Sequence, residues 1–178
     1  MTDHKVVSRA EWQAARDELL RREKEHTRMA DELSRQRREL PLASNFNTKI
    51  IEEFRANGGR VGGPLAGTPM ILIHHIGARS GVVRVTPLAC NPQPDGRLAI
   101  VASNGGSPAH PGWYYNLKAN PAITVEVGTQ MFTAVAEELD DAARAELWPR
   151  LVAESPAIAE HQAKTTRQIP VFMLIRRD

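Results

Sequence analysis

The stretch that decides the fold is Met70-Ile-Leu-Ile-His-His-Ile76 followed by Gly77-Ala-Arg-Ser-Gly-Val-Val-Arg-Val-Thr-Pro87. The apolar run predicts a β-strand, and Val83–Cys90 predicts a second strand that runs back along it. Gly77 and Gly81 allow the chain to reverse between the two, because glycine adopts backbone conformations closed to other residues. The stretch therefore predicts a β-hairpin.

The turn of this hairpin carries the residue types of an anion-binding site. Arg79 and Ser80 lie at its tip, and Arg84 lies just inside the second strand. The glycine-rich turn adds backbone N–H groups that no neighbouring strand uses. Charge-assisted hydrogen bonds from arginine are the strong ones, so the turn suits a phosphate or a carboxylate. A solvent-exposed turn that happens to carry two arginines is the alternative interpretation.

The remaining apolar runs are short and closely spaced, as in a β-barrel. Helical patterns over Pro111–Ala119 and Asp140–Ala153 fall in the later connections. This order predicts a closed or half-open antiparallel barrel, and the absence of G-x-G-x-x-G and G-x-x-x-x-G-K-[ST] argues against a Rossmann or P-loop nucleotide site. The six expected strands are Met70–Ile76, Val83–Cys90, Leu98–Ser103, Ile123–Val127, Met131–Glu137 and Val171–Ile175.

Residues 1–41 differ from the rest and predict a long charged helix appended to a domain of residues 42–178. Ser8 and Glu11 have the spacing of a capping box at its start. The helix is either solvated or pairs with a second copy, packs along its own domain, or attaches to a membrane surface. Its thin apolar stripe consists of Trp12, Leu19, His26 and Leu33, with Ala15 and Met29 beside them.

Two further features concern this N-terminal region. Val7–Trp12 and Glu23–Arg28 resemble the N-terminal helix of an uncharacterised thioredoxin-like family, and the resemblance ends near Pro41. The thioredoxin-like body is absent, so only the helix is compared. A second helix is expected next, capped by Ser44 or Asn47 and ended by Asn57-Gly-Gly59.

Composition excludes several classes of function. The formal net charge of +2 over 178 residues gives no electrostatic case for nucleic acid. No apolar run approaches the roughly 20 residues that span a bilayer, and no signal-peptide core is present, so a cytoplasmic protein is expected. Cys90 is the only cysteine, which excludes an internal disulfide. Redox chemistry would therefore need a cofactor. The histidines lack metal-ligand spacing, so no metal site is expected.

A second loop has the features of a ligand site. The strand that ends at Ser103 runs into Asn104-Gly-Gly106, which presents backbone N–H groups and a hydroxyl. The helix that starts at Pro111 adds an N-terminus that favours negative charge. Trp113, at that helix start, either covers an aromatic ring of a ligand or is a core residue.

Taken together, these motifs resemble those of the deazaflavin-dependent nitroreductase family from about Asn47 to the C-terminus. They are Gly77-x-Arg-Ser-Gly-x-x-Arg-x-x-Pro-Leu88, Ala102-Ser-x-Gly-Gly106, Pro111-x-Trp-Tyr-x-Asn-Leu-Lys-Ala-Asn-Pro121, Glu146-x-Trp-Pro149 and Arg167-x-Ile-Pro-Val171. The resemblance implies an α+β, mainly β fold, a six-stranded antiparallel split β-barrel with peripheral helices besides the long N-terminal helix. It also implies the deazaflavin coenzyme F420 and hydride transfer from its reduced form to a small electron-poor acceptor, such as a quinone, an enone or a nitro compound.

The same resemblance implies the roles of particular residues. Arg79 and Arg84 match positions that bind the anionic tail of the cofactor, and Ser103 is the candidate proton relay. The implied cofactor-binding set is Arg79, Ser80, Gly81, Arg84, Pro87, Ala102, Ser103, Asn104, Gly105, Gly106 and Trp113, and the implied substrate pocket is Ser155, Ile158 and His161. Nitroimidazole-reducing relatives carry tyrosines at those three pocket positions, and relatives often carry a basic residue at the position of Asn104.

Those departures keep two alternatives open. One is a non-catalytic protein that holds deazaflavin or a lipid-like ligand. The other is a split barrel that binds FMN. The expected partners are a small-molecule acceptor and no nucleic acid. A homodimer or a membrane-surface contact would be formed through the N-terminal helix.

Overall fold

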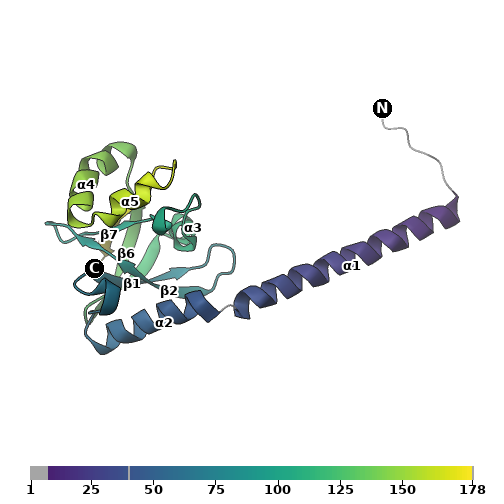
Figure 1. Cartoon of the computed structure of the whole chain (residues 1–178), viewed down its shortest axis with the longest axis horizontal. Helices are drawn as coiled ribbons and strands as arrows, with labels where there is room; N and C mark the ends of the chain where they lie inside the picture. The colour runs from purple at the N-terminus through teal and green to yellow at the C-terminus, as the bar shows by residue number, and fades with distance from the viewer. Residues whose placement is uncertain (1–7, 40, 178) are drawn as a thin grey trace. The chain divides into compact units, whose positions relative to one another are not determined.

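The computed structural model describes residues 8–39 and 41–177, with the side chains of residues 8–29 and 46–177. The chain divides into two compact units, Met1–Asn45 and Phe46–Asp178. Figure 1 shows the long helix of the first unit and the curled sheet of the second. Among the described residues, no helix is long and apolar enough to cross a bilayer.

Helix α1 (Arg9–Glu39) confirms the predicted long helix and its capping box. The backbone N–H of Ser8 donates to Glu11 Oε2 at 2.9 Å, and the N–H of Glu11 donates to Ser8 Oγ at 3.3 Å. Trp12 and Leu19 of the apolar stripe are more than half exposed, at 53% and 55%. The side chain of Leu33 lies outside the described residues.

Helix α2 (Pro41–Ala56) begins earlier than the sequence predicted. Ser44 and Asn47 lie inside it, so the expected cap at either residue is wrong. Proline suits the first turn of a helix, because its φ is already helical and the N–H that it lacks has no partner there. The predicted stop is confirmed, since the helix ends just before Gly58, which adopts a φ of +59°.

One antiparallel sheet of seven strands forms the barrel, in the order β2-β1-β5-β6-β7-β4-β3. The expected count of six is wrong by one, because β3 is a two-residue strand too short to leave a sequence pattern. The strands are β1 (Met70–Ile76), β2 (Val83–Ala89), β3 (Asn91–Pro92), β4 (Leu98–Val101), β5 (Ala122–Val127), β6 (Gln130–Glu138) and β7 (Val171–Arg177). The helices of this unit besides α2 are η1 (Gly63–Leu65), η2 (Asn104–Gly106), α3 (Gly112–Ala119), α4 (Asp141–Glu154) and α5 (Ala157–Ala163).

The first four residues of strand β1 are apolar because both faces of the strand are covered there. Successive side chains of a strand point to opposite faces. Ile71 and Ile73 accordingly join the main core inside the sheet, while Met70 and Leu72 pack with Phe54 of α2 on the other face. The first strand of the predicted hairpin is thus fixed from both sides, and its turn projects from a rigid base.

Candidate functional site

The hairpin turn between β1 and β2 is held by two backbone hydrogen bonds. The N–H of Gly77 donates to Val82 O at 2.9 Å, and the N–H of Gly81 donates to Gly77 O at 2.8 Å. Gly81 has a φ of +66°, a conformation that favours glycine. A Cβ on Gly77 would meet Ser80 Oγ and lie 3.5 Å from Arg84 Nε. The hydroxyl and the guanidinium therefore lie on the same side of the turn.

Arg79 and Arg84 are the available cations of this turn. Both side chains are exposed, and neither forms an ion pair with a carboxylate among the described residues. An unpaired guanidinium can offer its planar fork of donors to an anion from solvent. The two guanidinium groups suit a phosphate or carboxylate, but the expectation that the turn offers unpaired backbone N–H groups is wrong for Gly77, Ala78 and Gly81, whose N–H groups donate within the protein.

The loop after β4 is the second candidate anion-binding feature. Ser103 is right-handed, with φ −71° and ψ −35°, and Asn104 and Gly105 follow with φ values of +49° and +63°. A right-handed residue followed by a left-handed one is the backbone arrangement of anion-binding nests, in which successive N–H groups converge. The side chain of Asn104 donates to Ala109 O at 3.0 Å and so braces the loop.

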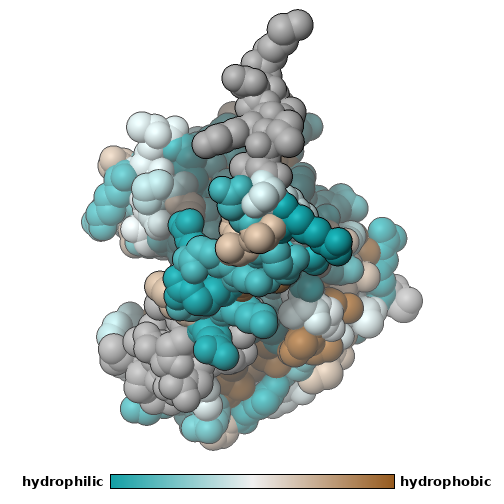
Figure 2. Space-filling view, turned by 90° about the vertical axis from the view of Figure 1, so that its right-hand side faces the viewer, coloured by the Kyte–Doolittle hydropathy of each residue, from teal (hydrophilic) through white to brown (hydrophobic). Residues whose placement is uncertain are grey.

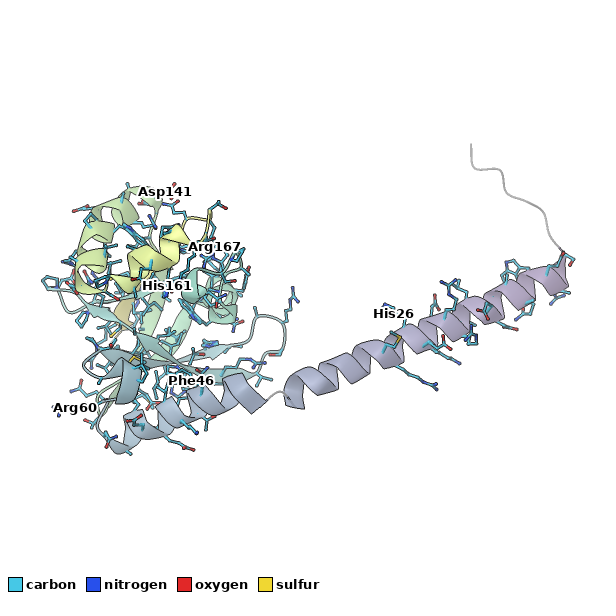
Figure 3. The ribbon with its side chains drawn as sticks, viewed as in Figure 1. His26, Phe46, Arg60, Asp141, His161 and Arg167 are labelled. Carbon is cyan, nitrogen blue, oxygen red and sulfur yellow. The ribbon has the colours of Figure 1, made fainter. Side chains whose placement is uncertain are left out.

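Arg167 holds this second loop in place. Its Nη2 donates to Ser103 O at 2.7 Å and to Ala102 O at 3.1 Å, and its Nε donates to Ser107 O at 2.9 Å. Figure 3 shows Arg167 beyond the end of α5, beside this part of the barrel. One guanidinium thus fixes three carbonyls of the loop, while the N–H groups of Gly106 and Ser107 donate to Ser103 O and Asn104 O inside it.

Helix α5 brings a histidine to the same loop. His161 Nδ1 lies 3.1 Å from Ser103 Oγ. The loop and the helix touch closely, because a Cβ on Gly106 would lie 2.7 Å from His161 O and 2.8 Å from Lys164 Cβ. The candidate proton relay Ser103 and the candidate pocket residue His161 are therefore in direct contact.

Helix α3 connects the two loops. It begins directly after the second loop, and its Asn116 Oδ1 accepts a hydrogen bond from the N–H of Ala78 in the first turn at 2.8 Å. Asn116 Nδ2 lies 3.0 Å from His75 Nδ1 of β1. The two candidate anion-binding loops are thus linked to each other through α3.

The other residues implied by the family resemblance are less exposed. Pro87 and Ala102 are buried, and Trp113 is 8% exposed and meets the ring of Phe172 edge-on at 6.1 Å. Ile158 packs against the apolar cluster beneath α4, and Ser155 caps the end of α4. Of the three expected pocket residues, the structure brings only His161 to Ser103.

Sequence reasoning missed the roles of Arg167 and Asn116, which appeared only as letters in the family pattern. The partners of Arg167 lie 60 to 65 residues away along the chain. Those of Asn116 lie 38 and 41 residues away. No local spacing signals such contacts. The candidates in the sequence were an arginine after α5 and an asparagine inside α3, neither of which stands out by itself.

A curled antiparallel sheet with two linked candidate anion-binding loops defines the class of protein, a small split barrel with a candidate site for an anionic ligand. Residues 47–176 match the family model described as F420H(2)-dependent quinone reductase, and the chain belongs to this family. Residues 1–62 separately match a model described as a bacterial protein of unknown function (DUF899).

Similar proteins cover most of the barrel. An F420H(2)-dependent quinone reductase of Mycobacterium tuberculosis (strain H37Rv) is 40% identical over 129 residues, which span 70% of this chain and 85% of the relative. The solved structure of an F420-H2 dependent reductase, FDR-A, is 42% identical, covers 60% of this chain and 93% of that one, and has a TM-score of 0.54. A solved structure described as a domain-swapped dimer is 39% identical over 71% of this chain and 92% of that one, with a TM-score of 0.56.

Proposed function

We propose that this protein reduces a small quinone with F420H2. The observation that carries the proposal is the site itself: an arginine-bearing turn and a glycine nest, joined by α3, next to a Ser103–His161 contact. The donor set fits the cofactor, because its phosphodiester and carboxylate tail need cations and N–H groups. Arg79 and Arg84 would hold the tail, and the Ser103–Gly106 loop would hold the phosphate or the ring.

F420H2, when bound, supplies the hydride. A quinone that takes up a hydride also takes up one proton to become a hydroquinone, and the protein can position that proton. His161 Nδ1 lies within hydrogen-bond distance of Ser103 Oγ and would pass a proton to it, and the serine hydroxyl then donates to the acceptor oxygen. The proton that leaves Ser103 is replaced from His161, which is only partly buried and exchanges with water.

Turnover of menadione with F420H2 tests the activity. It is monitored through the absorbance of oxidised deazaflavin, which returns as F420H2 is consumed. Ser103→Ala is expected to lower kcat about 10- to 100-fold, since a positioned proton donor is lost and water replaces it poorly. Ser107→Ala is the matched control, because Ser107 lies in the same loop and, among the described residues, its hydroxyl bonds only the N–H of Ala109. Its kcat should stay within about twofold of wild type.

Other results would select the remaining alternatives. Binding of F420 without turnover of menadione, an enone or a nitro compound would make the protein a non-catalytic deazaflavin carrier. Tighter binding of FMN than of F420 in competition would make it an FMN-binding barrel. Equal kcat values for Ser103→Ala and Ser107→Ala would remove the proton role of Ser103.

We also propose that α1 pairs with the α1 of a second copy in parallel. Trp12, Leu19 and Met29 form an exposed stripe, and the surface in Figure 2 is otherwise mostly hydrophilic, with brown patches of limited extent. Glu11, Glu18 and Glu25 follow one side of this stripe at seven-residue spacing. An antiparallel pair would set these glutamates against one another. A parallel pair sets Glu11 opposite Arg16 of the second copy and leaves one like-charge pair, Glu18 opposite Glu23.

The mass of the full chain in solution tests this pairing. Wild type is expected to be a dimer, and Trp12→Glu with Leu19→Glu is expected to be a monomer, because burying a carboxylate opposes association. Leu20→Glu is the matched control, since Leu20 lies next to Leu19 but off the stripe. A monomeric wild type, or a dimer that survives the double substitution, would refute the pairing.

A further inference from the structure

A chain of hydrogen bonds links the arginine-bearing turn to a buried histidine. The N–H of Ala78 donates to Asn116 Oδ1 at 2.8 Å, and a backbone N–H can only donate, so the orientation of the amide is fixed. Asn116 Nδ2 then donates to His75 Nδ1 at 3.0 Å. His75 must therefore carry its proton on Nε2, which donates to Thr86 Oγ1 at 2.9 Å.

The surroundings of His75 keep its ring neutral. The residue is 2% exposed, and burial, together with Arg84 on β2 and His74 on β1, lowers the pKa of His75 to about 4. The facing carboxylate of Glu126 on β5 lies 2.6 Å from His74 Nε2, and Arg55 of α2 pairs with it. At neutral pH the ring is thus an acceptor at Nδ1 and a donor at Nε2, as the geometry requires.

We propose that Asn116 and His75 are positioning residues that hold the Gly77–Gly81 turn in the conformation that binds F420. This inference rests on the proposed function. Asn116 bonds to the turn at Ala78, and His75 acts on the turn through Asn116, so both act without a contact to the cofactor. Thr86 belongs to the same chain of hydrogen bonds, because its hydroxyl oxygen accepts the hydrogen bond from Nε2 that fixes the ring of His75.

The protonation of His75 and the order of the turn are linked because this chain of hydrogen bonds has room for a fixed number of donors. If His75 gained a proton on Nδ1, that N–H would meet the NH2 group of Asn116. The amide would have to turn over, and its NH2 group would then meet the N–H of Ala78. A donor facing a donor leaves a polar group unpaired, so the neutral ring and the ordered turn stabilise each other.

Three variants of the full-length protein and a control test this chain of hydrogen bonds. Asn116→Leu keeps the size of the side chain but removes both hydrogen bonds, and Thr86→Val removes only the far acceptor. The third variant combines the two. Asn120→Leu, at the end of the same helix, is the matched control, because only the backbone of Asn120 bonds to α3. Each protein is measured by hydrogen exchange of the Ala78 amide without ligand, and by fluorescence titration with F420.

Asn116→Leu is expected to speed exchange of the Ala78 amide at least about tenfold and to weaken F420 binding about fivefold, the effect of one lost hydrogen bond. Thr86→Val should weaken F420 binding about threefold in wild type and have no further effect in Asn116→Leu, because residues in one network do not add. Asn120→Leu should match wild type in both measurements. Nitrogen NMR should show the Nε2–H form of His75 at neutral pH.

The outcomes separate this inference from the proposed function. If Asn116→Leu binds F420 as tightly as wild type does, or if the two substitutions multiply in their effects, the positioning role is refuted while the function stands. If wild type fails to bind F420, the proposed function is refuted and the cofactor part of the inference falls with it. Unchanged exchange at Ala78 in Asn116→Leu would refute the hydrogen-bond chain itself.

Discussion

Replacing Arg79 and Arg84 together by alanine is expected to weaken F420 binding about 1,000-fold. Each hydrogen bond to a charged group contributes about 1.5–3 kcal/mol, so two lost cations remove about 3–6 kcal/mol, and 1.4 kcal/mol corresponds to a factor of ten. The free energy of unfolding should change by less than about 0.5 kcal/mol, since both side chains are exposed and pair with no carboxylate among the described residues. Fluorescence titration and urea unfolding measure the two quantities.

Arg97→Ala is the matched control for this pair. Arg97 is also an exposed arginine at a hairpin turn, but its guanidinium already pairs with Asp95 at 2.6 Å. F420 binding should therefore be unchanged in this variant. Added salt should weaken the binding of F420 to wild type, because salt screens exposed charges. It should have less effect on the double variant, which lacks both arginines. Binding within about threefold of wild type in the double variant would refute the tail site.

The hairpin could be predicted because its signals are local. A mostly apolar run, two glycines and a second run rich in β-branched residues are each visible within a short window, and β1 and β2 begin where these signals do. The start of α2 was missed for a related reason. Pro41 was interpreted as the stop of the first helix, and α1 does end at Glu39, but the same proline is also the first residue of the next helix.

The interior of the candidate site could not be predicted in the same way. Arg167 has no special neighbours in the sequence, and its role exists only because the barrel brings it to the carbonyls of Ala102, Ser103 and Ser107. In the sequence His75 is one of two adjacent histidines of the first strand, whose side chains point to opposite faces. Its partner Asn116 lies 41 residues away, so the hydrogen bond that assigns its ring proton needs the tertiary structure.

Gly106→Ala should have the largest effect on the stability of the site, lowering the free energy of unfolding by about 3 kcal/mol. Gly106 has a φ of +85°, which costs an L-residue about 1–2 kcal/mol. Its new Cβ would also lie 2.7 Å from His161 O and 2.8 Å from Lys164 Cβ, and overpacking of this kind costs about 1–3 kcal/mol more. Urea unfolding at neutral pH measures the sum.

Gly105→Ala separates these two causes. Gly105 has a similar φ of +63°, but a Cβ there would meet nothing within 4 Å, so only the backbone strain of about 1 kcal/mol is expected. The difference between the two variants is then the contact between the loop and α5. A Gly106→Ala protein no less stable than Gly105→Ala would mean that α5 does not press against the loop.

The same contact sets the distance between His161 and Ser103, so Gly106→Ala should also lower turnover. If it acts by moving α5 away from the loop, its effect on kcat should disappear once His161 is already removed, because residues that act as a unit are not additive. Menadione turnover of His161→Phe should therefore equal that of the double variant His161→Phe with Gly106→Ala. A further fall in the double variant would show that Gly106 serves the bound cofactor directly, through the N–H groups of its loop, rather than through the histidine.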